Sequence, residues 1–170
     1  MTTLTIDIET FSSVDIKTCG LNKYVESDDF EVMLFGYSFD HDEPVVVDLM
    51  NLEDIPEHVI KAIVDPKITK RAYNAMFERV CLSKHFGLEL DPAQWECTMV
   101  RVAALSLPLG LDKVARALKL EVQKNPRGFN LIRVFSIPCK PTAKNGMRTR
   151  NYPHHELNYW EEFSDTAPTT

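Results

Sequence analysis

The segment that most constrains the fold is Leu4-Thr5-Ile6-Asp7-Ile8-Glu9-Thr10, in which apolar and polar side chains alternate close to the N-terminus. Successive side chains of a β-strand point to opposite faces, so Ile6 and Ile8 share the face that a core would cover. Asp7 and Glu9 then lie side by side on the other face, where a cation or a shared proton would stabilise them. Taken alone, the pair fits a half-buried edge strand more readily than a metal site, because many strands alternate in this way. Only a second acidic position would favour the metal site.

Length and composition predict one globular domain. The chain has 170 residues, of which 44% are hydrophobic, enough for one sizeable core and too few for two comfortable domains. It has no apolar run of membrane-spanning length and no secretion signal pattern at its N-terminus, so we expect a cytoplasmic protein. The four cysteines lack C-x-x-C spacing and are predicted to be reduced thiols rather than zinc ligands.

Strand and helix signals predict an α/β fold with a mixed five-stranded sheet. Two β-type runs flank turn-forming residues and predict an antiparallel hairpin, so that the first three strands are antiparallel. Strand and helix then alternate, which predicts parallel strands with helices over the faces. After the first strand, the predicted strands are 31–39, 44–49, 68–73 and 94–97, and the predicted helices are 57–64, 75–86, 98–105, 111–118, 128–137 and 156–163.

Two stretches are predicted to be irregular. Residues 10–29 are polar and predict a long connection with a single turn of helix, and prolines make residues 138–152 irregular.

The net charge of −6 argues against binding nucleic acid through bulk charge. Basic residues nevertheless cluster late in the chain. They could form either a solvated surface or a track that binds phosphates. They are Lys113, Arg116, Lys119, Lys124, Arg127, Lys140, Lys144, Arg148 and Arg150.

A second acidic position follows the predicted strand at residues 68–73. Asn74 stands where a helix would be capped, and Glu78 falls in the first turn of that helix. Sites in α/β sheets form at the carboxyl ends of parallel strands, so Glu78 is expected to reach a cation held by Asp7 and Glu9. Three carboxylates without His or Cys suit Mg²⁺ or Mn²⁺ better than Zn²⁺. Two such ions would activate a water and stabilise the leaving oxygen of a phosphodiester.

These residues resemble the 3'-5' proofreading exonuclease domain of family A DNA polymerases, above all those of phages. That domain belongs to the DEDD exonuclease superfamily and has a ribonuclease H-like fold. Asp7-Ile8-Glu9-Thr10 is similar to its first motif, D-x-E-T, and Asn74, Phe77 and Glu78 are similar to its second. The acid of the second motif is usually Asp, whereas it is Glu here. The resemblance covers nearly the whole chain, with the motifs in the expected order.

The resemblance implies a site and a reaction. Asp7, Glu9 and Glu78 would be catalytic and would hold Mg²⁺ or Mn²⁺. The family holds two ions, and this chain would hold two or only one. The resemblance implies nucleic-acid contacts from five residues, which are Thr10, Phe11, Ser12, Asn74 and Phe77. The substrate would be a single-stranded DNA 3' end, and the location would be the host cytoplasm if the protein is phage-encoded. The sequence does not distinguish DNA from RNA as the substrate.

The third motif of that family, a Tyr or His three residues before an Asp on the last helix, is absent. Asp165, Glu161 or Glu162 could substitute as the fourth ligand. The polar residues 164–170, which lack helical periodicity, favour the other explanation, a truncated phage polymerase fragment of impaired activity that another polypeptide could complete. The domain would comprise residues 1–137, followed by a loop and incomplete last helix at residues 138–170.

Two alternatives to an active enzyme remain at this point. The same fold could serve as an inactive module that binds nucleic acid or a protein such as a polymerase fragment. The chain could also self-associate through the last helix, where Leu157, Trp160 and Phe163 would otherwise lack partners. His154 and His155 have no Asp at the family's spacing, so a solvated turn is expected there.

Overall fold

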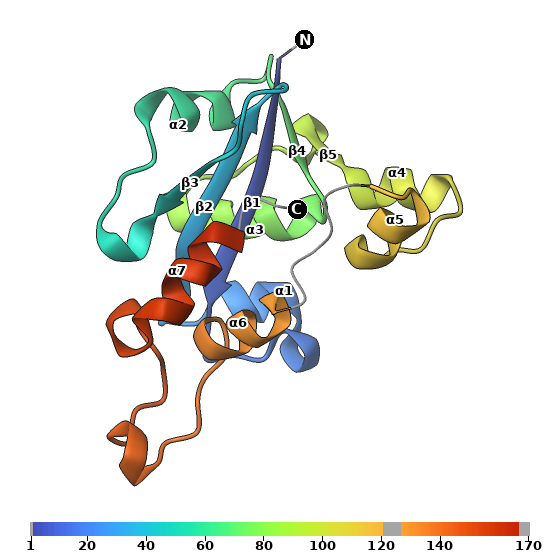
Figure 1. Cartoon of the computed structure of the whole chain (residues 1–170). Coiled ribbons are helices and arrows are strands. Elements are labelled where there is room, and N and C mark those ends of the chain that lie inside the picture. Colours follow the sequence, from blue (N-terminus) through green and yellow to red (C-terminus); the bar gives the residue numbers. More distant parts are fainter. Residues whose placement is uncertain (1, 121–126, 167–170) are drawn as a thin grey trace.

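The computed structural model describes residues 2–120 and 127–166 and places a five-stranded sheet at the centre of the protein (Figure 1). The strand order is β3-β2-β1-β4-β5. Strand β1 pairs antiparallel with β2, and β2 pairs antiparallel with β3, whereas β1–β4 and β4–β5 are parallel. The predicted mixed sheet is therefore confirmed. The strands are β1 (Thr3–Phe11), β2 (Glu31–Phe39), β3 (Val45–Asp48), β4 (Thr69–Ala72) and β5 (Trp95–Cys97).

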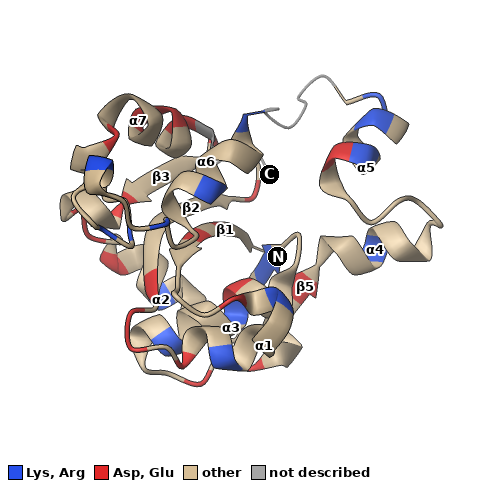
Figure 2. Ribbon diagram, turned by 90° about the horizontal axis from the view of Figure 1, so that it is seen from below, with Lys and Arg blue, Asp and Glu red and all other residues tan. Residues whose placement is uncertain are grey.

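Helices cover both faces of the sheet (Figure 2). One layer contains α1 (Ile16–Val25), α2 (Glu57–Val64) and α3 (Ala75–Phe86), and the opposite layer contains α6 (Gly128–Phe135) and α7 (Leu157–Thr166). The helices α4 (Thr98–Ala104) and α5 (Leu111–Ala117) lie beyond β5, to one side of both layers. Short 3-10 turns are η1 (Leu49–Asn51), η2 (Pro92–Gln94), η3 (Ala143–Asn145) and η4 (Pro153–His155).

The alternation in β1 builds the first core. Leu4, Ile6 and Ile8 are buried and join a cluster with residues of α1, α2 and α3. Helix α2 contributes Val59 and Ile63, which lie one turn apart on its buried side. Asp7 and Glu9, between the buried residues, are only half-buried. The predicted division of β1 into a core face and a polar face is confirmed.

The opposite face carries a second aromatic core, which contradicts the expectation that Trp160 and Phe163 lack partners. Both side chains are buried against Phe135 of α6, with ring centroids 4.9 and 5.5 Å from that of Phe135. The indole Nε1 of Trp160 also donates a hydrogen bond of 2.6 Å to Asp48 at the end of β3. Only Leu157 of the three predicted residues is exposed. Helix α7 therefore covers the sheet instead of offering an apolar surface.

The connection after β1 is more regular than predicted. Residues 16–25 form the helical segment α1, broken by Gly20, which has φ of +77°. Left-handed backbone favours glycine, and the break disturbs the apolar periodicity that would have predicted a helix. Tyr24 and Val25 at the end of α1 are buried in the first core. Helix α7 also extends through Thr166, beyond the predicted end near residue 163.

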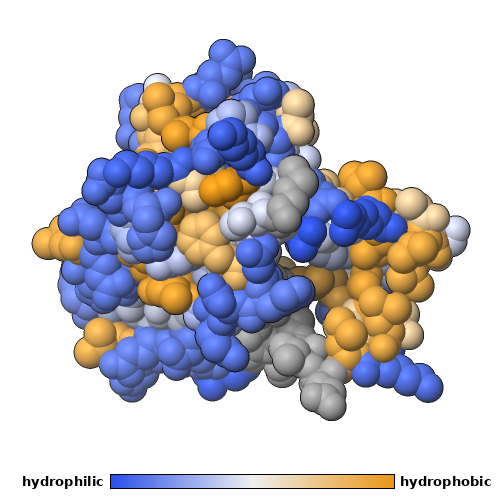
Figure 3. Space-filling model, turned by 90° about the horizontal axis from the view of Figure 1, so that it is seen from above, coloured by the Kyte–Doolittle hydropathy of each residue, from blue (hydrophilic) through white to orange (hydrophobic). Residues whose placement is uncertain are grey.

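Exposed apolar side chains gather on α4, α5 and their flanking residues. Figure 3 shows them on the lobe that projects from the side of the molecule. Leu105 is 71% exposed and Val100 is 63% exposed.

Lys124 of the predicted basic cluster and residues 167–170 lie outside the described residues. No helix in residues 2–120 or 127–166 is long and apolar enough to cross a membrane.

Candidate active site

Strand β1 presents Asp7 and Glu9 on the face of the sheet that α6 and α7 cover. Directly opposite residues of antiparallel strands share a face, and the partners of Asp7 and Glu9 on β2 are Gly36 and Leu34. Leu34 belongs to the aromatic core of that layer. The pair of carboxylates is therefore next to an apolar core and is still half-exposed to solvent.

Asp7 is one of the residues that line a surface pocket of about 210 Å³. Gly36 also lines this pocket, and since glycine has no side chain, nothing from that position covers Asp7. The other lining residues come from β1, β2 and the turn after β2: Thr5, Ile6, Tyr37, Ser38 and Pro44. Asp7 is therefore open to the pocket on this side of the sheet.

Glu78 approaches the pair from a different element. Strand β4 runs parallel to β1 and leads through Asn74 into α3, whose first turn carries Glu78. The side chain is 5% exposed, and its Oε2 atom has no hydrogen-bond partner in the described part of the chain. Buried carboxylate oxygens are normally hydrogen-bonded, so this atom needs either a proton or a cation.

Electrostatics link Glu78 to Asp7 and Glu9. Burial raises the pKa of Glu78 from 4.5 to about 8, against the lowering effect of a hydrogen bond from its own backbone N–H. The negative charges of Asp7 and then Glu9 raise this pKa further. Because the charges of all three interact, the structure brings the sequence-predicted acids into one neighbourhood.

The residues present suit a hard divalent cation. Three carboxylates offer oxygen ligands of the kind that Mg²⁺ and Mn²⁺ prefer, and the unsatisfied Oε2 of Glu78 would gain a partner. Within the described residues, no three His, Cys, Asp or Glu side chains are already arranged around a metal position. Binding would therefore require the carboxylates to turn toward a common point.

Three of the predicted nucleotide contacts are buried. The hydroxyls of Thr10 and Tyr24 share a hydrogen bond of 2.8 Å, and the hydroxyl of Ser12 donates to the Tyr24 carbonyl at 2.9 Å. Phe11 packs in the aromatic core. The hydroxyls of Thr10 and Ser12 thus connect the end of β1 to α1, and little of the three side chains is left exposed to a nucleotide.

The remaining two predicted contacts lie at the start of α3. Asn74 occupies the N-cap position, but its side chain makes no capping hydrogen bond, contrary to expectation, and it is exposed. Phe77 is half-buried against the first core, and its ring centroid is 6.3 Å from that of Tyr24. Asn74 is therefore available to a ligand, whereas Phe77 mainly packs against Tyr24 and the first core.

The substitutes considered for a fourth ligand lie on α7. Glu162 forms an ion pair of 3.1 Å with Arg127, while Glu161 and Asp165 are exposed. None of the three is among the groups whose charge raises the pKa of Glu78. Of the acids considered from the sequence, Asp7 and Glu9 therefore act electrostatically on Glu78, and the three described acids of α7 do not.

Tyr24 is a residue of this site that sequence reasoning missed. Burial raises its pKa to about 12, and the charge of Glu9 adds to this effect. Its hydroxyl fixes Thr10, the neighbour of Glu9, through the hydrogen bond described above. No sequence signal marked Tyr24, because it lies in the stretch that was predicted to be a polar connection.

Comparison with known sequences identifies a phage relative. A DNA polymerase of Bacillus phage SP02 is 53% identical over 163 residues, which cover 96% of this chain and 25% of the polymerase. The chain spans about a quarter of the length of that relative, and it is homologous to that part of a phage DNA polymerase. No protein-family model matches the chain.

Comparison with solved structures identifies nuclease folds. Brucella melitensis NrnC has a TM-score of 0.53 and 18% identity, with 72% of this chain and 54% of that chain covered. NrnC structures with bound Mg²⁺ and bound to pGG match equally well, and an apo form of a nuclease has a TM-score of 0.52. The fold is therefore ribonuclease H-like, and the similarities together support a nuclease-like function.

Proposed function

We propose that the chain is a metal-dependent 3'-5' exonuclease domain that removes nucleotides from a single-stranded DNA end. The observation that carries this proposal is the buried carboxylate of Glu78, whose Oε2 atom has no hydrogen-bond partner among the described residues and whose pKa is raised by the charges of Asp7 and Glu9. The phage polymerase relative supports DNA as the substrate, and the NrnC structures with Mg²⁺ and pGG support a metal and a nucleotide ligand for this fold.

In this proposal Asp7, Glu9 and Glu78 hold Mg²⁺ or Mn²⁺. A bound cation of this kind supplies an acidified water and neutralises charge on the leaving oxygen of a phosphodiester. Glu78 would lose its proton to bind the cation, because its raised pKa otherwise favours the protonated form near neutral pH. Asn74 contacts the terminal nucleotide, while Thr10, Phe11, Ser12 and Phe77 fix the backbone around it.

Residues 1–137 and 138–170 act as one exonuclease domain in this proposal, as part of a phage DNA polymerase. The aromatic core between α6, α7 and the sheet supports this joint role, because it fixes the second segment over the face that carries Asp7 and Glu9. With three acids and no assigned fourth ligand, the activity is expected to be low.

A nuclease assay with Mn²⁺ on 5'-labelled single-stranded DNA tests the proposal. Wild type is expected to shorten the strand stepwise from its 3' end, and Asp7→Ala and Glu78→Gln are expected to lose this activity. Glu43→Ala is the matched control, because Glu43 is an exposed acid in the turn between β2 and β3. Equal activity in Asp7→Ala and wild type would refute the proposed site.

A catalytically inactive binding module is the second candidate. It is favoured by one observation, that no described group of acids is already arranged around a metal. This candidate predicts that wild type binds single-stranded DNA or a polymerase fragment and that no strand is shortened with either cation.

A further inference from the structure

The loop between α6 and α7, residues 136–156, is a locally basic segment in an acidic protein. It contains Lys140, Lys144, Arg148 and Arg150, and its first acid is Glu156 at its very end, whereas the whole chain has a net charge of −6. The loop projects beyond the sheet at the end where β1 finishes (Figure 1). Its charge is thus concentrated on an extension of the molecule.

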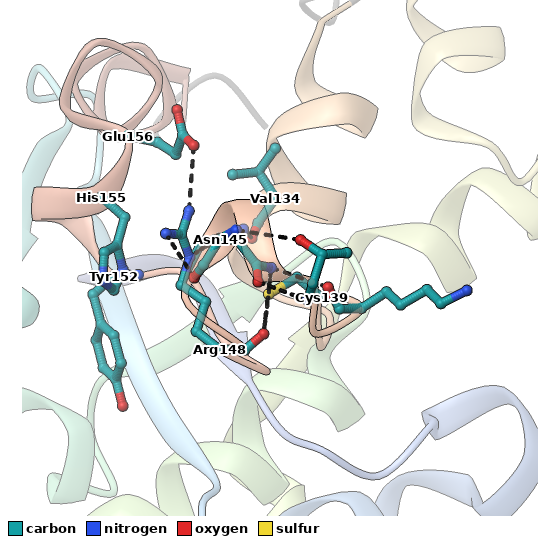
Figure 4. A network of polar contacts seen from close by, with 10 residues as sticks. Val134, Cys139, Asn145, Arg148, Tyr152, His155 and Glu156 are labelled. Atoms are coloured by element: carbon teal, nitrogen blue, oxygen red, sulfur yellow. Dashed lines mark hydrogen bonds and ion pairs between the residues drawn. The ribbon is translucent and has the colours of Figure 1, made fainter.

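A dense polar network makes this loop a defined structure despite its lack of regular elements (Figure 4). The side chain of Asn145 donates to the Lys140 carbonyl at 3.0 Å and accepts from the Thr142 N–H at 2.8 Å. The N–H of Cys139 donates to the Thr149 carbonyl at 2.8 Å, which joins the two arms of the loop. Because the backbone is held in this way, ligand binding would not have to order it.

The loop is anchored beside the candidate active site. The guanidinium of Arg150 lies 4.0 Å from the ring centroid of Phe11 and forms an ion pair of 2.5 Å with Glu31. Phe11 is two residues beyond Glu9 on β1, a separation of about 7 Å along a strand. Asn151 also donates to the Val134 carbonyl of α6 at 2.9 Å. A strand that leaves the site past the end of β1 would therefore meet this loop.

Two of the four basic residues of the loop form ion pairs within the described part of the chain, and the other two form none there. Arg148 and Arg150 are half-buried and occupied by Glu156 and Glu31. Lys140 and Lys144 are exposed, and neither forms an ion pair with any residue in the described ranges. The two lysines are therefore free to contact an external anion.

Exposed rings on the same loop, beside Arg150, favour a nucleic acid over an acidic protein. Tyr152 is 37% exposed, and its ring is parallel to that of His154, with a centroid distance of 5.9 Å and an interplanar angle of 6°. Parallel aromatic surfaces beside basic groups are typical of sites that bind single strands, where bases stack and phosphates pair with lysine.

We propose that this loop binds the DNA strand a few nucleotides from its 3' end, with Lys140 and Lys144 on phosphates and Tyr152 and His154 under a base. The inference rests on the proposed exonuclease function, because it takes the 3' end to lie at Asp7, Glu9 and Glu78. It predicts a substrate several nucleotides long, of which only the end is at the site of hydrolysis.

Fluorescence anisotropy in EDTA tests the loop without hydrolysis, with labelled single-stranded DNA of about 12 and about 3 nucleotides. The double variant Lys140→Ala/Lys144→Ala is expected to bind the longer strand about tenfold more weakly at low salt. For this variant, the slope of log affinity against log salt concentration should be less steep by about 1.4, since each of the two lost phosphate contacts on a single strand contributes about 0.7. Binding of the short strand should not change.

Controls separate charge from folding. Lys140→Arg/Lys144→Arg should retain wild-type binding, and Lys61→Ala/Lys67→Ala should do so too, because those lysines lie around α2 in the opposite layer. Wild-type affinity and salt dependence in the Lys140→Ala/Lys144→Ala variant would overturn the proposal, as would a wild type that binds no single strand. Polyglutamate binding as tight as that of DNA would overturn it in favour of an acidic protein partner. Since hydrolysis is not measured, failure of the Asp7→Ala test leaves this result interpretable.

Discussion

Glu78→Gln should make the metal-free protein less sensitive to rising pH. The pKa of Glu78 is raised from 4.5 to about 8, so between these values the folded protein holds a proton that the unfolded chain has released. The free energy of unfolding therefore falls as the pH rises through this window, and the fall is complete above the folded pKa. At about 1.4 kcal/mol per pKa unit, the full effect is about 5 kcal/mol. Between about pH 6 and about pH 8, the free energy of unfolding falls by about 2 kcal/mol.

Urea denaturation in EDTA at these two pH values measures the effect. Wild type should lose about 2 kcal/mol more than Glu78→Gln, because glutamine is neutral at both pH values and has nearly the same shape. Glu89→Gln is the control, since Glu89 is an exposed acid shortly after α3. It should follow the wild-type profile. Parallel pH profiles of wild type and Glu78→Gln would refute the reasoning that a buried, protonated Glu78 faces two acids.

Two further substitutions test the layer that carries α6 and α7. Phe135→Ala should destabilise the protein by about 3–5 kcal/mol, because its fully buried ring packs on Trp160 and Phe163, and thermal unfolding would show this as a lower Tm. Asp48→Ala should cost about 2–3 kcal/mol, because Asp48 accepts hydrogen bonds from Trp160 and from two N–H groups of η1. Near-wild-type unfolding midpoints in urea would contradict either account.

The sequence predicted those parts of the fold whose signals are local. Alternation defined β1, and the helix α3 begins after Asn74 and ends at Gly87, which has the left-handed φ of +65° that favours glycine at a helix end. The pairing of α6 with α7 was missed because about twenty residues separate the two helices and no periodicity links them. Trp160 and Phe163 therefore looked unpartnered, although Phe135 covers them.

The sequence also did not predict the contacts of two side chains that lie in stretches without regular periodicity. Tyr24 lies in α1, whose apolar pattern is interrupted at Gly20, so neither the helix nor its contact with Thr10 was evident. Arg150 was counted as one basic residue among nine, whereas the structure places its guanidinium between Phe11, Glu31 and Tyr152. Such roles depend on tertiary neighbours, which residue type and spacing do not specify.

The three acids of the candidate site could be named from sequence, but their division of roles could not. Asp7 and Glu9 lie on an alternating strand and stay half-exposed, so water can stabilise their charges. Glu78 is the same residue type as Glu9, yet burial in the first turn of α3 places its Oε2 atom where no described hydrogen-bond donor reaches it. In the absence of a cation, a proton is the stabilising partner left for that carboxylate. A cation bound by the proposed site would take the place of that proton, and this exchange would follow from burial rather than from the motif.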